Sequence, residues 1–217
     1  YVRDGLKLYM PYNSPKEVKF VGEGSTGFVQ GSSQYVDCGN DSTLQITGAL
    51  TISVWIKTST DDDWMWVAGK DDSTNRNFYM YIANDGEIVF VVTSSGTAYE
   101  VGNTTATQIA DGKWHHISAV YSPSVFLKLY IDGVEKADNT TSIPASIDND
   151  TVNFVIGKRN DHYYNGSLKN VALWDRALSA TEVQNVMYKT YTDLSGTLLS
   201  GLVSWWALES DYLDKHG

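Results

Sequence analysis

Two short segments of the chain are rich in side-chain oxygen atoms and could bind a ligand. They cover residues 70–77 and 158–165. Carboxylate and amide oxygens accept hydrogen bonds from sugar hydroxyl groups, and they are also the hard ligands that Ca²⁺ prefers. The same residue types are common in tight turns, so an ordinary turn is the alternative interpretation. The candidate ligand-binding residues of these segments are Asp71, Asp72, Asn75, Asn160 and His162.

Aromatic side chains offer a second way to bind a sugar, whose apolar ring face stacks on Trp or Tyr. Trp64 borders an acidic run at residues 61–63, and it alternates with Trp66, so both indoles are predicted to share one face of a strand. Tyr163 and Tyr164 lie within the second oxygen-rich segment. We add Trp64, Tyr163 and Tyr164 to the candidate ligand-binding residues; the alternative is that these rings pack in the core.

The adjacent histidines His115 and His116 are an obvious candidate pair for metal binding or acid–base chemistry. They fall in a segment with the alternation of a β-strand, in which neighbouring side chains point to opposite faces. They therefore cannot converge on one metal ion or share one proton, and we predict structural roles for both. The sequence also lacks the Gly-x-Ser-x-Gly pattern that places a nucleophilic serine on a sharp turn.

Composition limits the kinds of partner. The 217 residues carry a formal net charge of -10, which argues against nucleic acid and against an anionic membrane surface as partners. No apolar run approaches the ~18 residues that would span a bilayer. The single cysteine, Cys38, cannot form an internal disulfide, so a hydrophobic core must stabilise the fold.

The elements that would position these residues are mostly β-strands. Residues 50–57 alternate apolar and polar side chains, as a half-buried strand does. Asp-Gly pairs at residues 85–86 and 132–133 each separate two extended runs and predict tight hairpins. Further strands are expected within residues 28–36, 64–68, 114–121, 152–157 and 168–174. Many short strands with turns between them predict an all-β antiparallel sandwich or jelly roll.

One short helix is predicted near the C-terminus. Ser179 and Glu182 form a capping box, and Val183, Val186 and Met187 follow on one helical face. A weak repeat relates the two ends of the chain, because residues 5–11 resemble residues 201–208. We therefore divide the chain into residues 1–200 and a terminal strand at residues 201–217, which either closes the same sandwich or begins a second, similar domain.

Seven motifs between residues 27 and 188 resemble, in order, the laminin G-like jelly roll of the concanavalin A-like lectin/glucanase superfamily. These motifs are residues 33–37, 50–57, 111–121, 129–133, 154–157, 164–168 and 174–179. The resemblance implies a concanavalin A-like antiparallel β-sandwich with one short C-terminal helix. It also implies a non-catalytic extracellular recognition module that binds glycans or mediates adhesion. The motifs themselves are mostly structural, so they support the fold more directly than the function.

Two other functions compete with glycan recognition. The first is a structural or protein-adhesion module of a phage or secreted multidomain protein, without a small ligand. The second is a glycosidase or lyase, but the sequence lacks the Glu-x-Asp-x-x-Glu strand of the glucan-hydrolysing relatives. Modules of this kind occur in tandem in secreted bacterial proteins and in phage proteins, so the resemblance implies an extracellular or virion-associated location and a longer multidomain chain. The lack of a disulfide favours a bacterial or phage source over an animal matrix protein.

The resemblance to pentraxins within this superfamily implies a tentative metal site. Their calcium-binding loops place family ligands at Asn77 and Asp161, with Asn160 where they have Gln. Arg76 and Arg159 stand where that site has acids, so a two-calcium site is not expected. A single Ca²⁺ and direct ligand contact without metal are the two alternatives.

Overall fold

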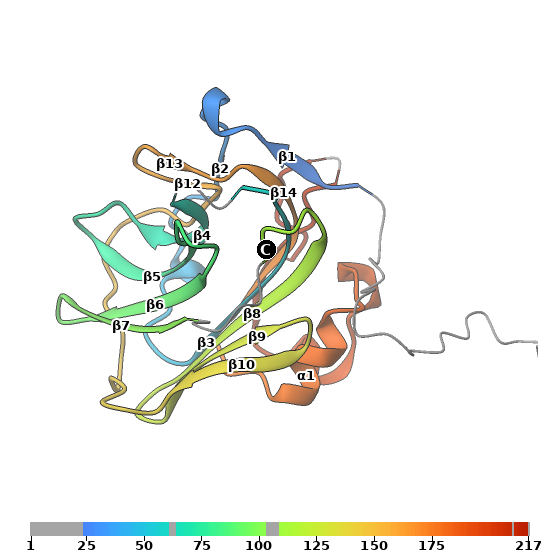
Figure 1. Cartoon of the computed structure of the whole chain (residues 1–217). Coiled ribbons are helices and arrows are strands. Elements are labelled where there is room, and N and C mark those ends of the chain that lie inside the picture. The colour runs from blue at the N-terminus through green and yellow to red at the C-terminus, as the bar shows by residue number, and fades with distance from the viewer. Residues whose placement is uncertain (1–23, 61–63, 103–108, 210, 217) are drawn as a thin grey trace, which may run out of the picture.

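Two antiparallel sheets lie face to face and enclose the main core (Figure 1). The computed structural model describes residues 24–60, 64–102, 109–209 and 211–216. The seven-stranded sheet contains, in spatial order, β1 (Thr26–Phe28), β14 (Gly166–Trp174), β3 (Leu50–Lys57), β8 (Trp114–Ser122), β9 (Phe126–Ile131) and β10 (Val134–Asn139), with β15 (Leu202–Trp206) also paired to β14.

The six-stranded sheet carries the strands that lead into the oxygen-rich segments. Its spatial order is β2 (Val36–Asp37), β11 (Val155–Ile156), β4 (Met65–Asp71), β5 (Arg76–Ile82), β6 (Ile88–Ser94) and β7 (Thr97–Gly102). A separate two-stranded hairpin consists of β12 (Lys158–Arg159) and β13 (His162–Tyr163). This architecture confirms the predicted antiparallel β-sandwich.

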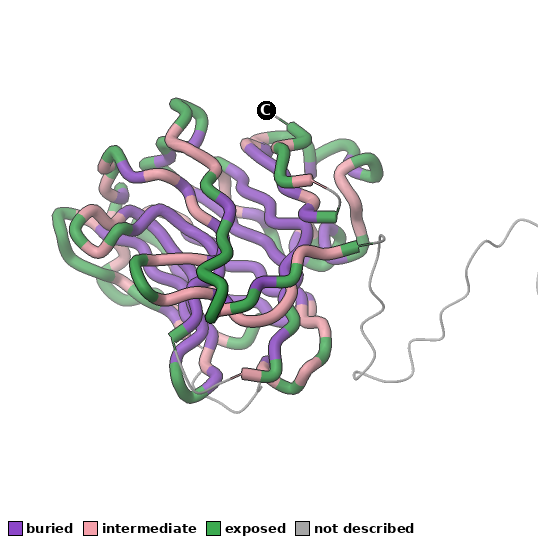
Figure 2. Tube along the Cα trace, turned by 90° about the horizontal axis from the view of Figure 1, so that it is seen from above, coloured by how far each residue is buried: buried purple, intermediate pink, exposed green. Residues whose placement is uncertain are grey.

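Alternation along the strands places apolar side chains between the sheets. In β3, Ile52, Val54 and Ile56 are fully buried in that core. On the opposite face of β3, Ser53 and Trp55 are also buried, and both lie against His116 of β8. Elsewhere on this outer face of the seven-stranded sheet, α1 (Ala180–Val186) and the segment after it form a second apolar layer with β14 and β15. Figure 2 shows the buried strands inside and the exposed loops around them.

The local patterns for turns and for the helix are confirmed. Asp132 and Gly133 both have positive φ, 52° and 74°, as the tight turn between β9 and β10 requires. Gly86 turns the chain between β5 and β6 with φ 78°. The Ser179 hydroxyl accepts from the Glu182 N–H, and the Glu182 carboxylate accepts from the Ser179 N–H, so the predicted capping box is present.

The strand predicted over residues 28–36 is wrong. The chain instead forms β1, a 3₁₀ turn at Gln30–Ser32 and then β2, and the two strands belong to different sheets. Ser33, with φ 53°, ends the turn in the left-handed region and redirects the chain from one sheet to the other. Apolar residues stand only at the two ends of this run, and the Gly-Ser-Ser sequence at residues 31–33 was the available sign of the turn.

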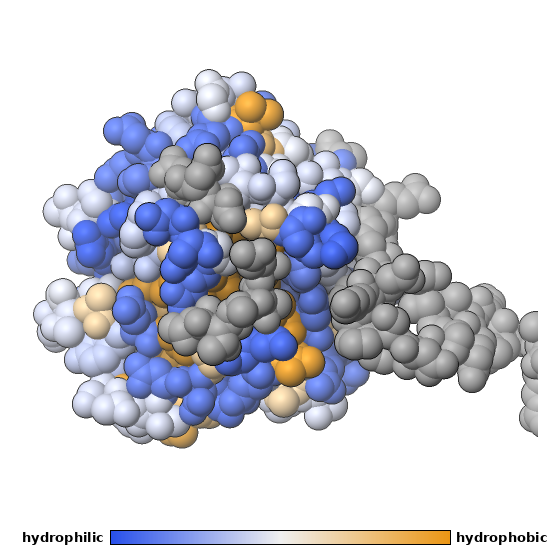
Figure 3. Space-filling view, viewed as in Figure 1, coloured by the Kyte–Doolittle hydropathy of each residue, from blue (hydrophilic) through white to orange (hydrophobic). Residues whose placement is uncertain are grey.

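The surface is largely polar, in keeping with the acidic composition. The face seen in Figure 3 is mostly hydrophilic, with small areas where hydrophobic side chains come to the surface. The described part of the chain contains no helix with the length and apolarity needed to cross a bilayer.

Candidate functional site

The turn between β4 and β5 is held by its own side chains. Asp72 accepts hydrogen bonds from the backbone N–H of Thr74 at 3.0 Å and of Asn75 at 2.7 Å. The Asn75 side-chain amide donates to the second Asp72 oxygen at 3.0 Å. These bonds outweigh the effect of burial and lower the pKa of Asp72 below its usual value. Asn75 therefore shapes the turn and does not line the adjacent pocket.

The hairpin of β12 and β13 reaches over to this turn. Asn160, at the hairpin tip, has φ 49° in the left-handed region, which Asn tolerates better than most residues. Its side-chain amide donates to the Ser73 hydroxyl at 2.9 Å across 87 positions of sequence. The two oxygen-rich segments thus meet, as a binding site built from both requires.

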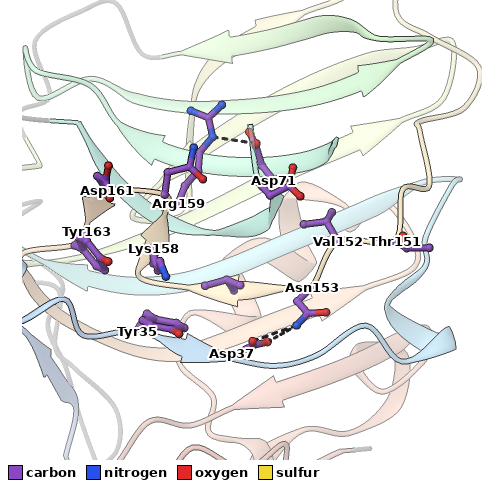
Figure 4. A pocket seen from close by; sticks show the side chains of 13 residues that line it. Tyr35, Asp37, Asp71, Thr151, Val152, Asn153, Lys158, Arg159, Asp161 and Tyr163 are labelled. Carbon is purple, nitrogen blue, oxygen red and sulfur yellow. Dashed lines mark hydrogen bonds and ion pairs between the residues drawn. The ribbon is translucent and has the colours of Figure 1, made fainter. Parts of the chain in front are cut away.

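The meeting point is a pocket of about 630 Å³, which we call the inter-loop pocket (Figure 4). Strands β2, β4, β11, β12 and β13 contribute to its walls. Its lining residues are Tyr35, Asp37, Asp71, Asp72, Thr151, Val152, Asn153, Val155, Lys158, Arg159, Asn160, Asp161 and Tyr163. Five of the predicted site residues, counting the tentative metal ligand Asp161, are among them.

A buried ion cluster forms one wall of the inter-loop pocket. The Asp71 side chain is fully buried, and its Oδ1 lies 2.9 Å from the Arg159 Nε and 4.0 Å from the Arg76 Nε. Burial raises the pKa of Asp71, while the Ser73 N–H and the two guanidinium groups act in the opposite direction. Among the residues that the structure describes, none donates a hydrogen bond to the other carboxylate oxygen, Oδ2. Asp71 thus fixes Arg159 in place and keeps an unused acceptor.

Two tyrosines bracket a lysine on the other side of the inter-loop pocket. The Lys158 ammonium lies 4.1 Å from the centre of the Tyr35 ring and 5.7 Å from that of Tyr163, both within cation–π range. No carboxylate of the described residues forms an ion pair with Lys158. Tyr35 is 45% exposed, so one of these rings is open to a ligand. Figure 4 shows Lys158 pointing toward Tyr35 and away from Asp71.

The four carboxylates that line the inter-loop pocket are unequally free. Asp37 accepts from the Gly39 N–H and from the Asn153 side-chain amide, and Asp71 and Asp72 are engaged as described above. Asp161 is exposed and accepts no hydrogen bond among the described residues. Glycoside hydrolysis needs two carboxylates acting together, so such a pair would have to include a group already bound to its neighbours.

Trp64 lies far from the inter-loop pocket, so it does not belong to the same site as the candidate ligand-binding residues that line it. It precedes β4, whereas Asp71 ends β4, so a strand rise of ~3.3 Å per residue separates them by roughly 20 Å. Trp64 is 41% exposed and stacks on Tyr81 with ring centres 5.1 Å apart. Trp66 stacks on the same ring at 5.1 Å, which confirms that the two indoles share a face.

Tyr164 is the clearest correction among the predicted ligand-binding residues. Its side chain is fully buried in the core and packs edge-on against Phe28. The strand alternation after β13 turns Tyr163 toward the inter-loop pocket and Tyr164 inward, so Tyr164 cannot contact a ligand. His162 is half-buried and does not line the inter-loop pocket either.

The two tentative metal ligands are not brought together. Asp161 lines the inter-loop pocket, but Asn77 is 1% exposed and does not. The Asn77 side chain donates to the Asp150 carbonyl at 3.1 Å and accepts from the Asp150 N–H at 3.0 Å. Its oxygen is therefore used to hold a loop. Among the described residues, no three His, Cys, Asp or Glu side chains are placed to share an ion.

The histidines occupy opposite faces of β8, as predicted. His116 is buried beside the Ser53 hydroxyl at 2.8 Å, and burial lowers its pKa to about 4. His115 lies between Asp132 at 2.9 Å and Asp111 at 3.2 Å, and these carboxylates raise its pKa despite the opposing effect of burial. Both serve the structure of the sheet and its hairpin.

Sequence reasoning missed several residues that line the inter-loop pocket. The predicted ligand-binding residues do not include Tyr35, Lys158 or Arg159, and the resemblance to pentraxins makes Arg159 an argument against a two-calcium site. Adjacent residues in β12 point to opposite sides, so Lys158 faces the tyrosines while Arg159 lies over Trp66, 4.4 Å from its ring centre. The basic pair Lys158 and Arg159, a few positions before Tyr163, was the available indication.

Comparison with solved structures shows the same fold in binding domains. The chain is similar to the binding domain of Paraclostridial Mosquitocidal Protein 1, with 15% identity, TM-score 0.63, and coverage of 77% of this chain and 46% of that one. A candidate carbohydrate-binding protein of Bacteroides ovatus matches with 16% identity, TM-score 0.63, and coverage of 86% and 52%. This chain thus spans about half the length of these two proteins.

A third similar structure is domain 4 of AbnA, an extracellular arabinanase of Geobacillus stearothermophilus, in complex with arabinotriose. It shares 18% identity and TM-score 0.59, with 76% of each chain covered. No curated protein sequence matches this chain. The family model described as the concanavalin A-like lectin/glucanases superfamily matches residues 30–184, which is more than half of the sequence. The chain therefore belongs to the concanavalin A-like lectin/glucanase superfamily.

Proposed function

We propose that this protein is a non-catalytic glycan-binding module and that the inter-loop pocket is its binding site. The observation that carries the proposal is the meeting of two distant loops around a pocket that combines tyrosine rings, one of them exposed, with polar groups. A sugar needs both kinds of surface, because its ring has an apolar face and its hydroxyl groups are donors and acceptors. In a purely structural module, the β4–β5 turn and the β12–β13 hairpin would not need to be joined.

Each part of the inter-loop pocket has a role in this proposal. The exposed Tyr35 ring offers a surface for the apolar face of a sugar, with Tyr163 beside it. The Lys158 ammonium donates to hydroxyl or carboxylate oxygens, and it needs little reorganisation because the two rings already hold it. Asp161 and Asp72 accept from sugar hydroxyl groups at the rim. Asp71 and Asn160 keep these groups in position.

The similar structures support a binding role without identifying the ligand. Two of them are described as binding domains or candidate carbohydrate binders, and a third holds arabinotriose. Three of the four carboxylates in the inter-loop pocket are held by neighbours, which favours recognition over hydrolysis. In this proposal the module acts outside the cell or on a virion, where it would meet a polysaccharide.

A glycan array followed by calorimetry tests the proposal. The array should include arabinans and other plant, algal and bacterial polysaccharides, and binding to at least one class is expected. Tyr35→Ala and Lys158→Met should then each lower the affinity roughly tenfold, since ~1.4 kcal/mol corresponds to that factor. Tyr188→Ala, at a tyrosine that is 42% exposed and outside the inter-loop pocket, is the control and should bind normally. A silent array would overturn the proposal.

A further inference from the structure

The outer edge of β14 is covered by two segments from opposite ends of the chain. β1 pairs with it from Thr26↔Leu168 to Phe28↔Gly166, and β15 pairs with it from Trp206↔Val171 to Leu202↔Trp174. Both strands are antiparallel to β14, so they run in the same direction, β15 first and β1 after it. Together they form one interrupted edge strand.

The two segments touch where one ends and the other begins. The Thr26 hydroxyl donates to the Leu208 carbonyl at 3.1 Å, and a Cβ at Gly24 would lie 3.1 Å from the Cβ of Glu209. The place filled by β15 is therefore the place that a strand just upstream of β1 would reach by continuing along the same edge. We call this place, beside residues 170–174, the edge slot.

The edge slot makes specific demands on its occupant. Trp205 packs in the outer layer, with its ring centre 6.3 Å from that of Trp174. Trp206 enters the main core and stacks on Phe154 at 5.0 Å, and Leu208 is fully buried there. At the entry, Gly201 has φ 68°, and a Cβ on it would lie 2.5 Å from the Asp175 Oδ1. The occupant must therefore be a glycine followed by large apolar residues at fixed offsets.

Residues 5–12 carry the same pattern upstream of β1. They lie outside the residues that the structure describes, so the match is one of sequence. Relative to Gly5, the residues Leu6, Tyr9, Met10 and Tyr12 fall at the offsets that Leu202, Trp205, Trp206 and Leu208 have from Gly201. Pro11 corresponds to Ala207, whose carbonyl accepts from the Asn170 N–H at 3.0 Å. A proline keeps that carbonyl, so this bond can still form.

We propose that the edge slot is an exchangeable docking site whose second occupant is residues 5–12 of the same chain. When they are seated, Met10 takes the place of Trp206 opposite Val171, and residues 13–25 connect this segment to β1, which begins opposite Leu168. Residues 201–208 are then released to pair with another sheet edge. An extended segment that adds to an exposed edge gains backbone hydrogen bonds from any sequence and specificity from its alternate side chains. The two ends of the chain are thus alternative occupants of one site.

Thermal unfolding of the full chain tests the exchange through a double-mutant cycle. Trp206→Asp would put a carboxylate into the core if β15 stayed docked, so it favours release of β15. We expect Trp206→Asp to remain folded, and Met10→Asp alone to shift the Tm by less than about 2 °C. The double variant should unfold at least ~6 °C below Trp206→Asp, because both occupants are then disabled. Lys7→Asp, at the position matching the half-exposed Val203, is the control and should add little.

Additive effects of Met10→Asp and Trp206→Asp would overturn the exchange, and so would an unfolded Trp206→Asp.

A crosslink in the Trp206→Asp background tests the register separately. Tyr9→Cys and Ala172→Cys should form a disulfide within one chain, because Ala172 is the register partner of Trp205. Leu8→Cys in place of Tyr9→Cys should not, since neighbouring strand residues face opposite sides. No crosslink, or one between two chains, would show that residues 5–12 of the same chain do not fill the edge slot.

Discussion

The side-chain amide of Asn160 donates to the hydroxyl of Ser73 at 2.9 Å, and this bond ties the β12–β13 hairpin to the β4–β5 turn. Both residues have positive φ, 49° and 73°, so each loop is bent at the point of contact. The bond is exposed, so it contributes little to the free energy of folding, and its main effect is to hold the two loops in position. It fixes the width of the inter-loop pocket.

Replacing Asn160 should separate these two effects. Asn160→Ala should lower the free energy of unfolding by about 1–2 kcal/mol, because alanine pays that cost in the left-handed region. Asn160→Gly adopts the conformation freely and should be more stable than Asn160→Ala, yet both variants lose the bond to Ser73. Urea unfolding and glycan calorimetry check this. Normal glycan affinity in Asn160→Gly would show that the bond does not shape the inter-loop pocket.

Asp71→Asn should destabilise the protein by about 3 kcal/mol, because it leaves the Arg159 and Arg76 charges beside a buried neutral group. Asp72→Asn is the matched control on the next residue. Its side chain is exposed, and an asparagine oxygen can still accept from the turn, so its effect should stay within about 0.5 kcal/mol. Urea unfolding measures both variants. Equal stabilities would contradict the role of Asp71 as the anchor of Arg159.

His115 predicts a pH dependence of stability. Asp132 and Asp111 raise its pKa in the folded protein above the usual ~6.5, so the folded state holds the proton more tightly. The resulting stabilisation is fully present below about pH 6.5 and is lost as the pH rises through the raised folded-state pKa. The Tm of the wild type minus that of His115→Gln should therefore shrink between pH 6 and pH 9, roughly the range that spans this titration.

The Tm difference between the wild type and His115→Gln should also persist in moderately acidic solution. The hydrogen bonds of Asp111 with Lys113 and His115 outweigh its burial and lower its pKa to about 2, so its partnership with His115 persists well into acid. His116 is common to both proteins, so its own titration cancels in the comparison. A Tm difference that does not vary with pH would contradict the assigned pairing of His115.

Calcium binding is tested by thermal unfolding with excess Ca²⁺ and with a chelator. A ligand that binds the folded state raises the Tm by mass action. We expect no shift, because the Asn77 oxygen is engaged with Asp150 and two guanidinium groups flank Asp71. A saturable rise in Tm with Ca²⁺, lost in Asp161→Asn, would instead establish the single-ion alternative.

The sequence by itself determined the structural elements that depend on residues close together in the chain. The strand at residues 50–57, the Asp-Gly turns and the capping box at Ser179 each depend on neighbours within a few positions, and all of them are present. The ordered motifs also sufficed for the superfamily, because they record strand and turn chemistry. The position of the oxygen-rich segments at strand ends followed from the same patterns.

Only the tertiary structure decided which of these segments meet and which side chains face the ligand. The Ser73–Asn160 bond spans 87 positions, and Tyr35 reaches the inter-loop pocket only because the chain changes sheets after β1. Tyr163 and Tyr164 are the same residue type one position apart, yet one lines the inter-loop pocket and the other is fully buried. A shift of one position reverses the face of a strand residue, and the register that fixes that face is set by contacts distant in sequence.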